Sequence, residues 1–397
     1  MTTGDLKNVV VVGGSYVGRA TAKELAQALP STHRVLLVEP HSHFHHLFTF
    51  PRFAIVPGQE HKAFVPYSGL FSSLPNAANH AVVQARVLSV HARHVNLDRE
   101  WQGSKQLPFE YLALATGTSL AEPAGMKQDE KPPAVRYLQT HQEAVKRATS
   151  ILIAGGGAVG VQMATDLKEY FPDKAVTLVQ SRARVMPQFH PALHELISKR
   201  FDELGIDLIT GTRIVVPPTG FPNDGTPFQV QLTNGSTVPT ELVILATGQR
   251  PNNGLVAGLE PSHPGSLINP ENGFVRVRPT LQLLDLKYPH IFAVGDIADT
   301  GVQKAARPGI AQAAVLAKNV KALADGQEPT ETYVRNPAAI HLTLGMQYNV
   351  IFRNPNEAEG QTQPTIVEKQ DGREDMGVEG FWERQGIQVI NPQQYHL

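Results

Sequence analysis

The sequence contains no cysteine among its 397 residues. This absence excludes disulfides, cysteine zinc sites, iron–sulfur clusters and any redox thiol. No apolar run approaches the roughly 18 residues that span a bilayer, which predicts a soluble protein with at most peripheral membrane contact. A net charge of −1 offers no electrostatic footprint for nucleic acid. The N-terminal stretch has no secretory signal, so we expect a cytoplasmic location.

The length predicts two or three domains, and a short β-branched strand at residues 8–12 opens the first of them. A glycine turn from Gly13 to Gly18 and a helical pattern follow, and the next strand ends in Glu39. This pattern is the βαβ fingerprint of a dinucleotide-binding unit, in which the acidic residue accepts hydrogen bonds from a ribose. Ser15 occupies the middle glycine position of the fingerprint, and we expect this small side chain to be tolerated.

The same pattern occurs a second time. Residues 150–170 combine a strand, a complete G-x-G-x-x-G turn at Gly155, Gly157 and Gly160, and a helix, and residues 175–180 form the next strand. A single glycine motif is a weak signal, but two such motifs, each between a strand and a helix, favour two nucleotide sites. The alternative, two glycine-rich turns in an ordinary α/β protein, stays open at this point.

Further motifs support a duplicated architecture. Residues 111–118, "YLALATGT", and 242–252, "LVILATGQRPN", are each a buried strand ending in Ala-Thr-Gly. Residues 290–299, "HIFAVGDIAD", are a strand and turn, and a helix begins near Pro308. With the two glycine turns, these motifs resemble, in kind and order, those of the two-dinucleotide-binding-domain flavoprotein superfamily, in its apoptosis-inducing-factor-like branch. Type II NADH dehydrogenases are related enzymes.

The resemblance implies an α/β fold with two Rossmann-like domains and a small C-terminal α+β domain. The FAD-binding domain would span residues 1–122 and 249–330, interrupted by an NAD(P)-binding domain at 123–248, with the C-terminal domain at 331–397. The polar stretch from 353 to 377 is typical of a long loop or a partly disordered insert. The stretch "VEGFWERQGI" that follows predicts a short helix whose aromatic side chains lie in the core or at an acceptor site.

The resemblance also implies FAD at the first glycine turn and NADH or NADPH at the second. The implied FAD contacts are Gly13, Gly14, Ser15, Gly18, Glu39, Arg52, the main chain near Val82, Ala115, Thr116, Gly117 and Asp296. The implied nicotinamide nucleotide contacts are Gly155, Gly157, Gly160, Gln162, Gln180, Arg182 and Gly248. The candidates for catalytic residues are His45, His46 and Lys304. The helix after Pro308 would direct its N-terminal dipole toward the flavin.

The stretch "HSHFHHLFTFPR" at residues 41–52 contains four histidines. Disulfide reductases of this superfamily carry their redox cysteine pair in this slot, so electrons must here leave the flavin directly for a small acceptor. The histidines could tune the flavin or act in catalysis, or they could be packing residues. A metal role is disfavoured, because neighbouring histidines in a turn diverge and no spaced carboxylates support them. The pair His190 and His194 indicates a helix start rather than a metal site.

Two positions of the second unit depart from the family pattern. Gln180 stands where NAD-selective enzymes usually carry an acid, and Arg182 and Arg184 follow it. These arginines could bind a 2′-phosphate, which would make NADPH at least as suitable as NADH, or they could simply be solvated. Gln162 stands where quinone-reducing relatives commonly carry glutamate, which puts efficient NAD(P)H turnover in doubt.

The functional expectation is an FAD-dependent oxidoreductase that passes electrons from NAD(P)H through flavin to a quinone-like small acceptor. The alternative is a flavin-dependent oxidase or dehydrogenase acting on a specialised organic substrate with dioxygen as acceptor. A ferredoxin or rubredoxin reductase shares the same motifs but needs a charged docking patch. A nucleic-acid-binding effector is disfavoured by the balanced charge. The sequence makes no prediction of the oligomeric state.

Overall fold

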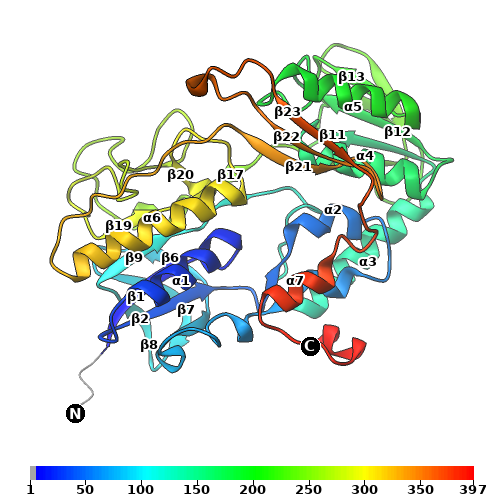
Figure 1. Ribbon diagram of the computed structural model, residues 1–397. Coiled ribbons are helices and arrows are strands. Elements are labelled where there is room, and N and C mark those ends of the chain that lie inside the picture. The colour runs from blue at the N-terminus through cyan, green and yellow to red at the C-terminus, as the bar shows by residue number, and fades with distance from the viewer. Residues whose placement is uncertain (1–5) are drawn as a thin grey trace.

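The computed structural model of the protein describes residues 6–397 and contains two parallel β-sheets, each packed against helices (Figure 1). Residues 1–5, which the sequence assigns to the start of the first domain, lie outside the described residues. The first sheet has the order β19-β9-β1-β2-β5, and its strands are β1 (Lys7–Val12), β2 (His33–Glu39), β5 (Ala81–Gln84), β9 (Tyr111–Leu114) and β19 (Ile291–Ala293).

Both faces of this first sheet are covered, as a parallel sheet requires. Helices α1 (Tyr16–Ala28) and α6 (Ala306–Ala324) lie side by side on one face (Figure 1). The other face packs against an antiparallel sheet of β6 (Val87–Val90), β7 (His94–Trp101) and β8 (Ser104–Pro108). The β-branched run of β1 is buried because Val9 and Val11 face the helices while Val10 and Val12 face the antiparallel sheet.

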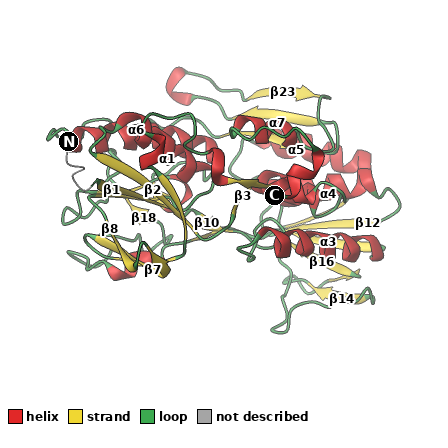
Figure 2. Cartoon of the chain, turned by 90° about the horizontal axis from the view of Figure 1, so that it is seen from below, coloured by secondary structure: helices red, strands yellow, loops and turns green. Residues whose placement is uncertain are grey.

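The second parallel sheet has the order β13-β12-β11-β16 and is inserted in sequence between β9 and β19. Helices α4 (Ala158–Tyr170) and α5 (Pro191–Leu204) cover one face, and a hairpin covers the other (Figure 2). Helix α3 (Lys131–Arg147) precedes the sheet. The other elements are β11 (Ser150–Ala154), β12 (Ala175–Gln180), β13 (Asp207–Thr210), the hairpin β14 (Phe228–Gln231) and β15 (Thr237–Thr240), and β16 (Leu242–Leu245).

This arrangement confirms the predicted fold class, with one Rossmann-like unit interrupted by another. The chain crosses between the two units at β10 (Thr118–Ser119) and β17 (Arg250–Pro251), which pair antiparallel. Asn252 links the two crossovers through two hydrogen bonds. Its side-chain Nδ2 donates to the Thr116 carbonyl at 2.8 Å, and its main-chain carbonyl accepts from Thr116 Oγ1 at 2.9 Å. The predicted residue limits of the domains stay predictions.

The C-terminal region forms a three-stranded antiparallel sheet of β21 (Ala339–Thr343), β22 (Asn349–Arg353) and β23 (Thr365–Lys369), followed by α7 (Val378–Arg384). The expectation of a long loop or partly disordered insert over residues 353–377 is wrong at β23, because this strand pairs with β22. The predicted helix is confirmed. Its Trp382 is fully buried and donates from Nε1 to the Lys62 carbonyl at 2.8 Å, so it belongs to the core.

The histidine-rich stretch after β2 folds as a short strand rather than as a regular helix. β3 (His43–His45) pairs antiparallel with β4 (Phe64–Pro66), and the one-turn helix α2 (Phe50–Phe53) lies between them in sequence. The small strands β18 (Val275–Arg276) and β20 (Ala298–Asp299) pair with each other beside the first sheet. Within residues 6–397, no helix combines the length and apolar content needed to cross a bilayer.

Candidate functional site

The first glycine turn has a shape that excludes side chains at two positions. Gly13 adopts φ +102°, and a Cβ there would lie 2.5 Å from the Ala115 carbonyl oxygen. A Cβ on Gly18 would lie 1.7 Å from the Gly13 carbonyl oxygen. Helix α1 begins directly after Ser15, and among the described residues no side chain caps its first amides. These free N–H groups and the helix dipole form an anion site suited to a pyrophosphate.

The second turn repeats this geometry. Gly155 adopts φ +119°, and a Cβ on Gly160 would lie 1.9 Å from the Gly155 carbonyl oxygen. At the middle position, a Cβ on Gly157 would meet no heavy atom within 4 Å among the described residues. Ser15 holds the same position in the first turn and is exposed. The open middle position therefore explains why serine is accommodated there.

Each turn is tied to the end of the following strand through one amide. In the first unit, the Gly14 N–H donates to the carboxylate of Glu39. In the second unit, the Gly156 N–H donates to Gln180 Oε1 at 3.1 Å. Both strand-end side chains are buried, so the two units share a local design and differ in the charge of one residue.

The amide of Gln180 is fixed at both ends. Its Oε1 also accepts from the Ser181 N–H at 3.1 Å, and its Nε2 donates to the Arg184 carbonyl at 3.0 Å. A carboxylate in place of this amide would direct an oxygen at the Arg184 carbonyl and could not donate a hydrogen bond to it. The side chains of Arg182 and Arg184 are exposed beside this neutral strand end, where a 2′-phosphate of NADPH would lie.

The strand ends on the other side of the first sheet carry the remaining candidate FAD contacts. The Ala115–Gly117 turn leads to Thr118, whose Oγ1 lies 3.5 Å from Asp296 Oδ2. Burial raises the pKa of Asp296, while Lys304 and Thr118 act to lower it. Burial lowers the pKa of Lys304, and the Lys304 Nζ donates to the Ala298 carbonyl at 2.5 Å. The structure thus brings Lys304 and Asp296 together.

A supporting residue of this region carries no sequence signal. Gln312, from the buried side of α6, accepts the Gly295 N–H through Oε1 at 2.7 Å and fixes the turn that presents Asp296. A glutamine within a helical pattern indicates nothing by itself. Its role follows from the three-dimensional position of α6.

His45 is a packing residue in this structure. Its ring lies 5.7 Å from that of Phe50 and 5.1 Å from that of Phe64, and it is 7% exposed. Burial, together with His41 and His43, lowers the pKa of His45 well below its usual range. A neutral imidazole surrounded by aromatic rings fits the packing alternative that the sequence left open.

His46 has a more specific environment. Its Nδ1 lies 2.6 Å from the Tyr16 hydroxyl, and its ring stacks on Phe381 at 3.8 Å with an interplanar angle of 8°. Burial, with Arg384 and Arg19 nearby, lowers the pKa of His46 to about 3. His46 is therefore a neutral imidazole beside the first residue of α1, joined there by the 54% exposed ring of Phe48.

The expected contact of Arg52 with FAD needs correction. Its side chain is 0% exposed, and its guanidinium donates to the Asp166 carboxylate at 2.7 and 2.9 Å and to the Gly345 carbonyl at 2.8 Å. Arg52 thus joins α2 to α4 and to the C-terminal sheet. A fully covered guanidinium cannot touch a cofactor. Arg52 therefore stabilises the fold and does not contact the flavin.

Val82, whose neighbouring main chain is a predicted FAD contact, lies in β5. The register of β2 with β5 pairs Val82 with Leu37 and places Gln84 level with Glu39. Val82 also lines a pocket of about 420 Å³ together with Tyr67, Phe71 and His80, among others. The contact of the main chain near Val82 with FAD therefore stays a prediction.

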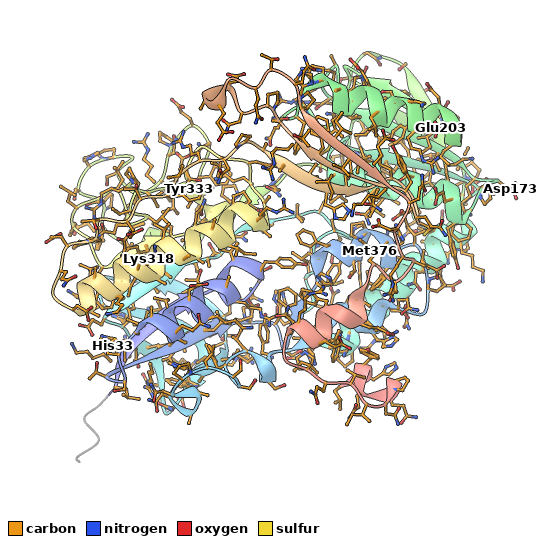
Figure 3. The ribbon with its side chains drawn as sticks, viewed as in Figure 1. His33, Asp173, Glu203, Lys318, Tyr333 and Met376 are labelled. Atoms are coloured by element: carbon orange, nitrogen blue, oxygen red, sulfur yellow. The ribbon has the colours of Figure 1, made fainter. Side chains whose placement is uncertain are left out.

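Gln162 lies at the junction that Arg52 organises. Its Nε2 lies 3.5 Å from Asp166 Oδ2 and 3.6 Å from the sulfur of Met376, which Figure 3 labels near the centre of the molecule. Gly248 is exposed, at the crossover from the second unit.

In the second histidine pair, His190 has a structural role. His190 caps α5, because its Nδ1 accepts the Ala192 N–H at 3.3 Å, which confirms the predicted helix start. Residues 6–397 contain no group of three His, Asp or Glu side chains arranged to hold a metal ion.

Comparison with known proteins extends these observations. The family model for pyridine nucleotide-disulphide oxidoreductases matches residues 7–317. Fe-regulated protein 8 of Mycosarcoma maydis is 33% identical over 401 residues, covering 96% of this chain and 95% of that protein. Ferroptosis suppressor protein 1 of Mus musculus is 29% identical over 348 residues, covering 86% and 87% of the two chains.

A solved structure shares the fold. The sulfide:quinone oxidoreductase of the hyperthermophilic bacterium Aquifex aeolicus superposes with a TM-score of 0.72 at 19% identity, covering 95% of this chain and 90% of that chain. The family match over most of the chain points to the same class of protein as the two glycine turns and the two parallel sheets. The protein belongs to the pyridine nucleotide-disulphide oxidoreductase family and is an FAD-dependent NAD(P)H oxidoreductase.

Proposed function

We propose that the protein takes electrons from NAD(P)H through FAD and passes them to a quinone-like small acceptor without using protein sulfur. One observation carries this proposal: the stretch after β2 contains packed aromatic and imidazole rings and no cysteine. The overall reaction balances as NAD(P)H, a proton and a quinone giving NAD(P)⁺ and a hydroquinone. FAD would supply the step that accepts a hydride and releases two electrons.

The residues of the first unit fit FAD. The uncapped start of α1 would bind the pyrophosphate, and Glu39 would accept a hydrogen bond from the adenosine ribose. The backbone of the Ala115–Gly117 turn and the Asp296 carboxyl lie at the carboxyl ends of β9 and β19. Ligands of open α/β sheets bind at such strand ends.

The residues of the second unit fit a nicotinamide nucleotide. The turn at Gly155, Gly157 and Gly160 would bind its pyrophosphate, and the neutral amide of Gln180 offers no repulsion to a 2′-phosphate. Arg182, exposed two residues after Gln180, would pair with that phosphate. NADPH is therefore at least as suitable as NADH. Gly248 would contribute main chain at the crossover.

The acceptor would meet the aromatic group formed by Tyr16, His46, Phe48 and Phe381. Phe48 is 54% exposed and stacks on Tyr16 at 4.5 Å, so this group offers an apolar ring surface beside the start of α1. His46 would act as a neutral hydrogen-bond donor to an acceptor carbonyl. His45, which lies deeper, is the weaker of the two catalytic candidates. Lys304 would act electrostatically beside Asp296.

The test is anaerobic stopped-flow mixing of the FAD-loaded protein with NADH or NADPH, followed by a second mix with a short-chain quinone. Flavin bleaching within a second and rapid reoxidation by the quinone would support the proposal. Bleaching without quinone reoxidation would refute the acceptor class. Phe48→Leu, which removes the exposed ring, should slow reoxidation more than bleaching.

A second function is favoured by Gln162. Its neutral amide bonds to Asp166 in place of the glutamate common in quinone-reducing relatives, which weakens the case for nicotinamide turnover. A flavin-dependent oxidase or dehydrogenase acting on a specialised organic substrate with dioxygen would need no nicotinamide. Absence of bleaching with both nucleotides would select this function.

The cellular setting belongs to the same proposal. We place the protein in the cytoplasm, with at most peripheral membrane contact and without a nucleic-acid partner. The balanced charge of the sequence supports the last point.

A further inference from the structure

The carboxylate of Glu39 is held by the protein on both oxygens. One oxygen, Oε2, accepts from the Gly14 N–H. The other, Oε1, accepts from the His41 main-chain N–H at 3.0 Å and from the His41 ring at Nδ1. Glu39 is 5% exposed, so these contacts leave it little freedom to turn.

Counting acceptor sites shows what remains for a ligand. A carboxylate has about four lone-pair sites for hydrogen bonds. His41 uses two of them and Gly14 uses one, which leaves a single site on Oε2. A ribose would therefore bond to Glu39 through one hydroxyl.

The ring of His41 is itself held by the segment that connects the two parallel sheets. Its Nε2 lies 3.8 Å from Asp129 Oδ1, and both oxygens of Asp129 accept from Arg86 at 2.7 Å. The Asp129 carbonyl also accepts the Ser42 N–H at 2.8 Å. Because Nδ1 faces a carboxylate, this nitrogen carries a proton and acts as the donor.

We propose that His41 is a positioning residue for the adenosine end of FAD. It acts through Glu39, whose carboxylate it turns so that one acceptor site faces the ribose, and Asp129 supports its ring. This inference rests on the proposed binding of FAD at the first glycine turn. It adds a residue that the dinucleotide fingerprint does not include.

The test is FAD affinity of the apoprotein, measured by the quenching of FAD fluorescence. His41→Ala and His41→Gln should each weaken FAD binding about 10- to 100-fold, the effect of losing one hydrogen bond to a charged group. His41→Asn should stay within about 3-fold of the wild type, because the asparagine amide nitrogen takes the place of Nδ1. Equal weakening by His41→Asn and His41→Ala would overturn the proposal.

A double variant separates positioning from a direct contact with FAD. If His41 acts through Glu39, adding His41→Ala to Glu39→Gln should change the dissociation constant less than about 3-fold. Additive effects would show that His41 works independently and would overturn the proposal. His43→Ala is the matched control: the His43 ring bonds to the Leu397 carbonyl at 2.9 Å and should leave FAD affinity unchanged.

The readouts also distinguish this inference from the function on which it rests. A wild-type apoprotein that fails to bind FAD would refute the proposed function itself. A wild type that binds FAD with a His41→Ala variant of equal affinity would refute the positioning role alone. Melting temperatures of the apoproteins identify any variant that fails to fold.

Discussion

At the scale of single residues, buried charge is concentrated where the Arg52 guanidinium meets the Asp166 carboxylate. Both side chains are 0% exposed. Such a pair adds little net stability over apolar residues, but removal of one partner leaves a buried charge without compensation. Burial raises the pKa of Asp166, and Arg52 opposes this effect. The pair therefore fixes how α2, α4 and the C-terminal sheet meet.

Arg52→Ala should lower the free energy of unfolding by about 3–5 kcal/mol, because Asp166 would remain buried and unpaired. Urea unfolding at pH 7 measures this loss. The variant Arg52→Met combined with Asp166→Leu should recover most of it, since both charges are then absent. FAD affinity of the folded fraction should stay near that of the wild type.

Arg99→Ala is the matched control, since its pair with Asp98 is largely exposed and worth at most about 1 kcal/mol. If Arg52→Ala kept its stability and lost FAD, Arg52 would be a cofactor contact after all.

The strand end of the second unit leads to another residue-scale prediction. Gln180→Glu should shift the preference from NADPH to NADH by about 30-fold or more, because a carboxylate repels the 2′-phosphate and bonds to a ribose. The ratio of flavin reduction rates with the two nucleotides measures this shift. The new carboxylate would also face the Arg184 carbonyl, so the affinities for NADPH and for NADH should both decrease.

Ser181→Ala should leave the NADPH/NADH ratio as it is, because Ser181 contacts Gln180 through its main chain. An unchanged ratio in Gln180→Glu would mean that the 2′ position is read by other residues.

At the scale of elements, the two glycine turns show which positions of the fingerprint are steric. A Cβ on Gly160 would overlap the Gly155 carbonyl, while the middle position at Gly157 is open and Ser15 already stands there in the first unit. The first kind of glycine is required for the helix to start against its strand. The second kind keeps space for a ligand.

Gly157→Ser should therefore change the melting temperature by less than about 2 °C, an effect of a few tenths of a kcal/mol. Gly160→Ala should cost about 3 kcal/mol, because the main chain of α4 must move away from the turn. Differential scanning calorimetry of the two variants is the measurement. A stable Gly160→Ala protein would contradict the steric reading of the turn.

Some elements could be predicted from the sequence and others could not. The two βαβ units were predictable because buried parallel strands read as short apolar runs and glycine turns mark their ends. Strand β23 was not, because Ile366 and Val367 are both exposed and no alternation marks the strand. Its pairing with β22 decides its structure.

At the scale of the whole molecule, the candidate acceptor site and the buried junction around Arg52 are each assembled from segments far apart in sequence. Arg52 meets Asp166 and Gly345, and His46 meets Phe381. Local patterns carry no information on such pairs, which explains why the resemblance assigned Arg52 to FAD. The glycine turns and Glu39 were predictable because their contacts lie within one βαβ unit.

Two histidines, the buried His46 and the half-buried His61, predict how the whole protein responds to acid. Burial lowers the pKa of His46 to about 3, and burial and His396 lower that of His61 to about 4. At pH 7 these imidazoles are neutral in the folded chain and about three-quarters neutral in the unfolded chain, so each takes up only a small fraction of a proton on unfolding. Below pH 6.5 these histidines are protonated in the unfolded chain but not in the folded chain. The free energy of unfolding must therefore decrease as the pH falls.

His46 alone should contribute a loss of about 1.4 kcal/mol per pH unit as the pH falls from about 6 toward 4, the value for uptake of one proton on unfolding. Urea unfolding at pH 7, 6, 5 and 4.5 measures the slope for the wild type and for His46→Gln, which does not titrate. The variant should be less stable at pH 7, because it loses the bond to Tyr16 and the stack on Phe381. Its pH slope should nevertheless be smaller by about one proton, whereas Phe48→Leu, which removes no titrating group, should keep the wild-type slope. Equal slopes for wild type and His46→Gln would mean that His46 accepts its proton in the folded protein, and the neutral imidazole assigned to the candidate acceptor site would then be wrong.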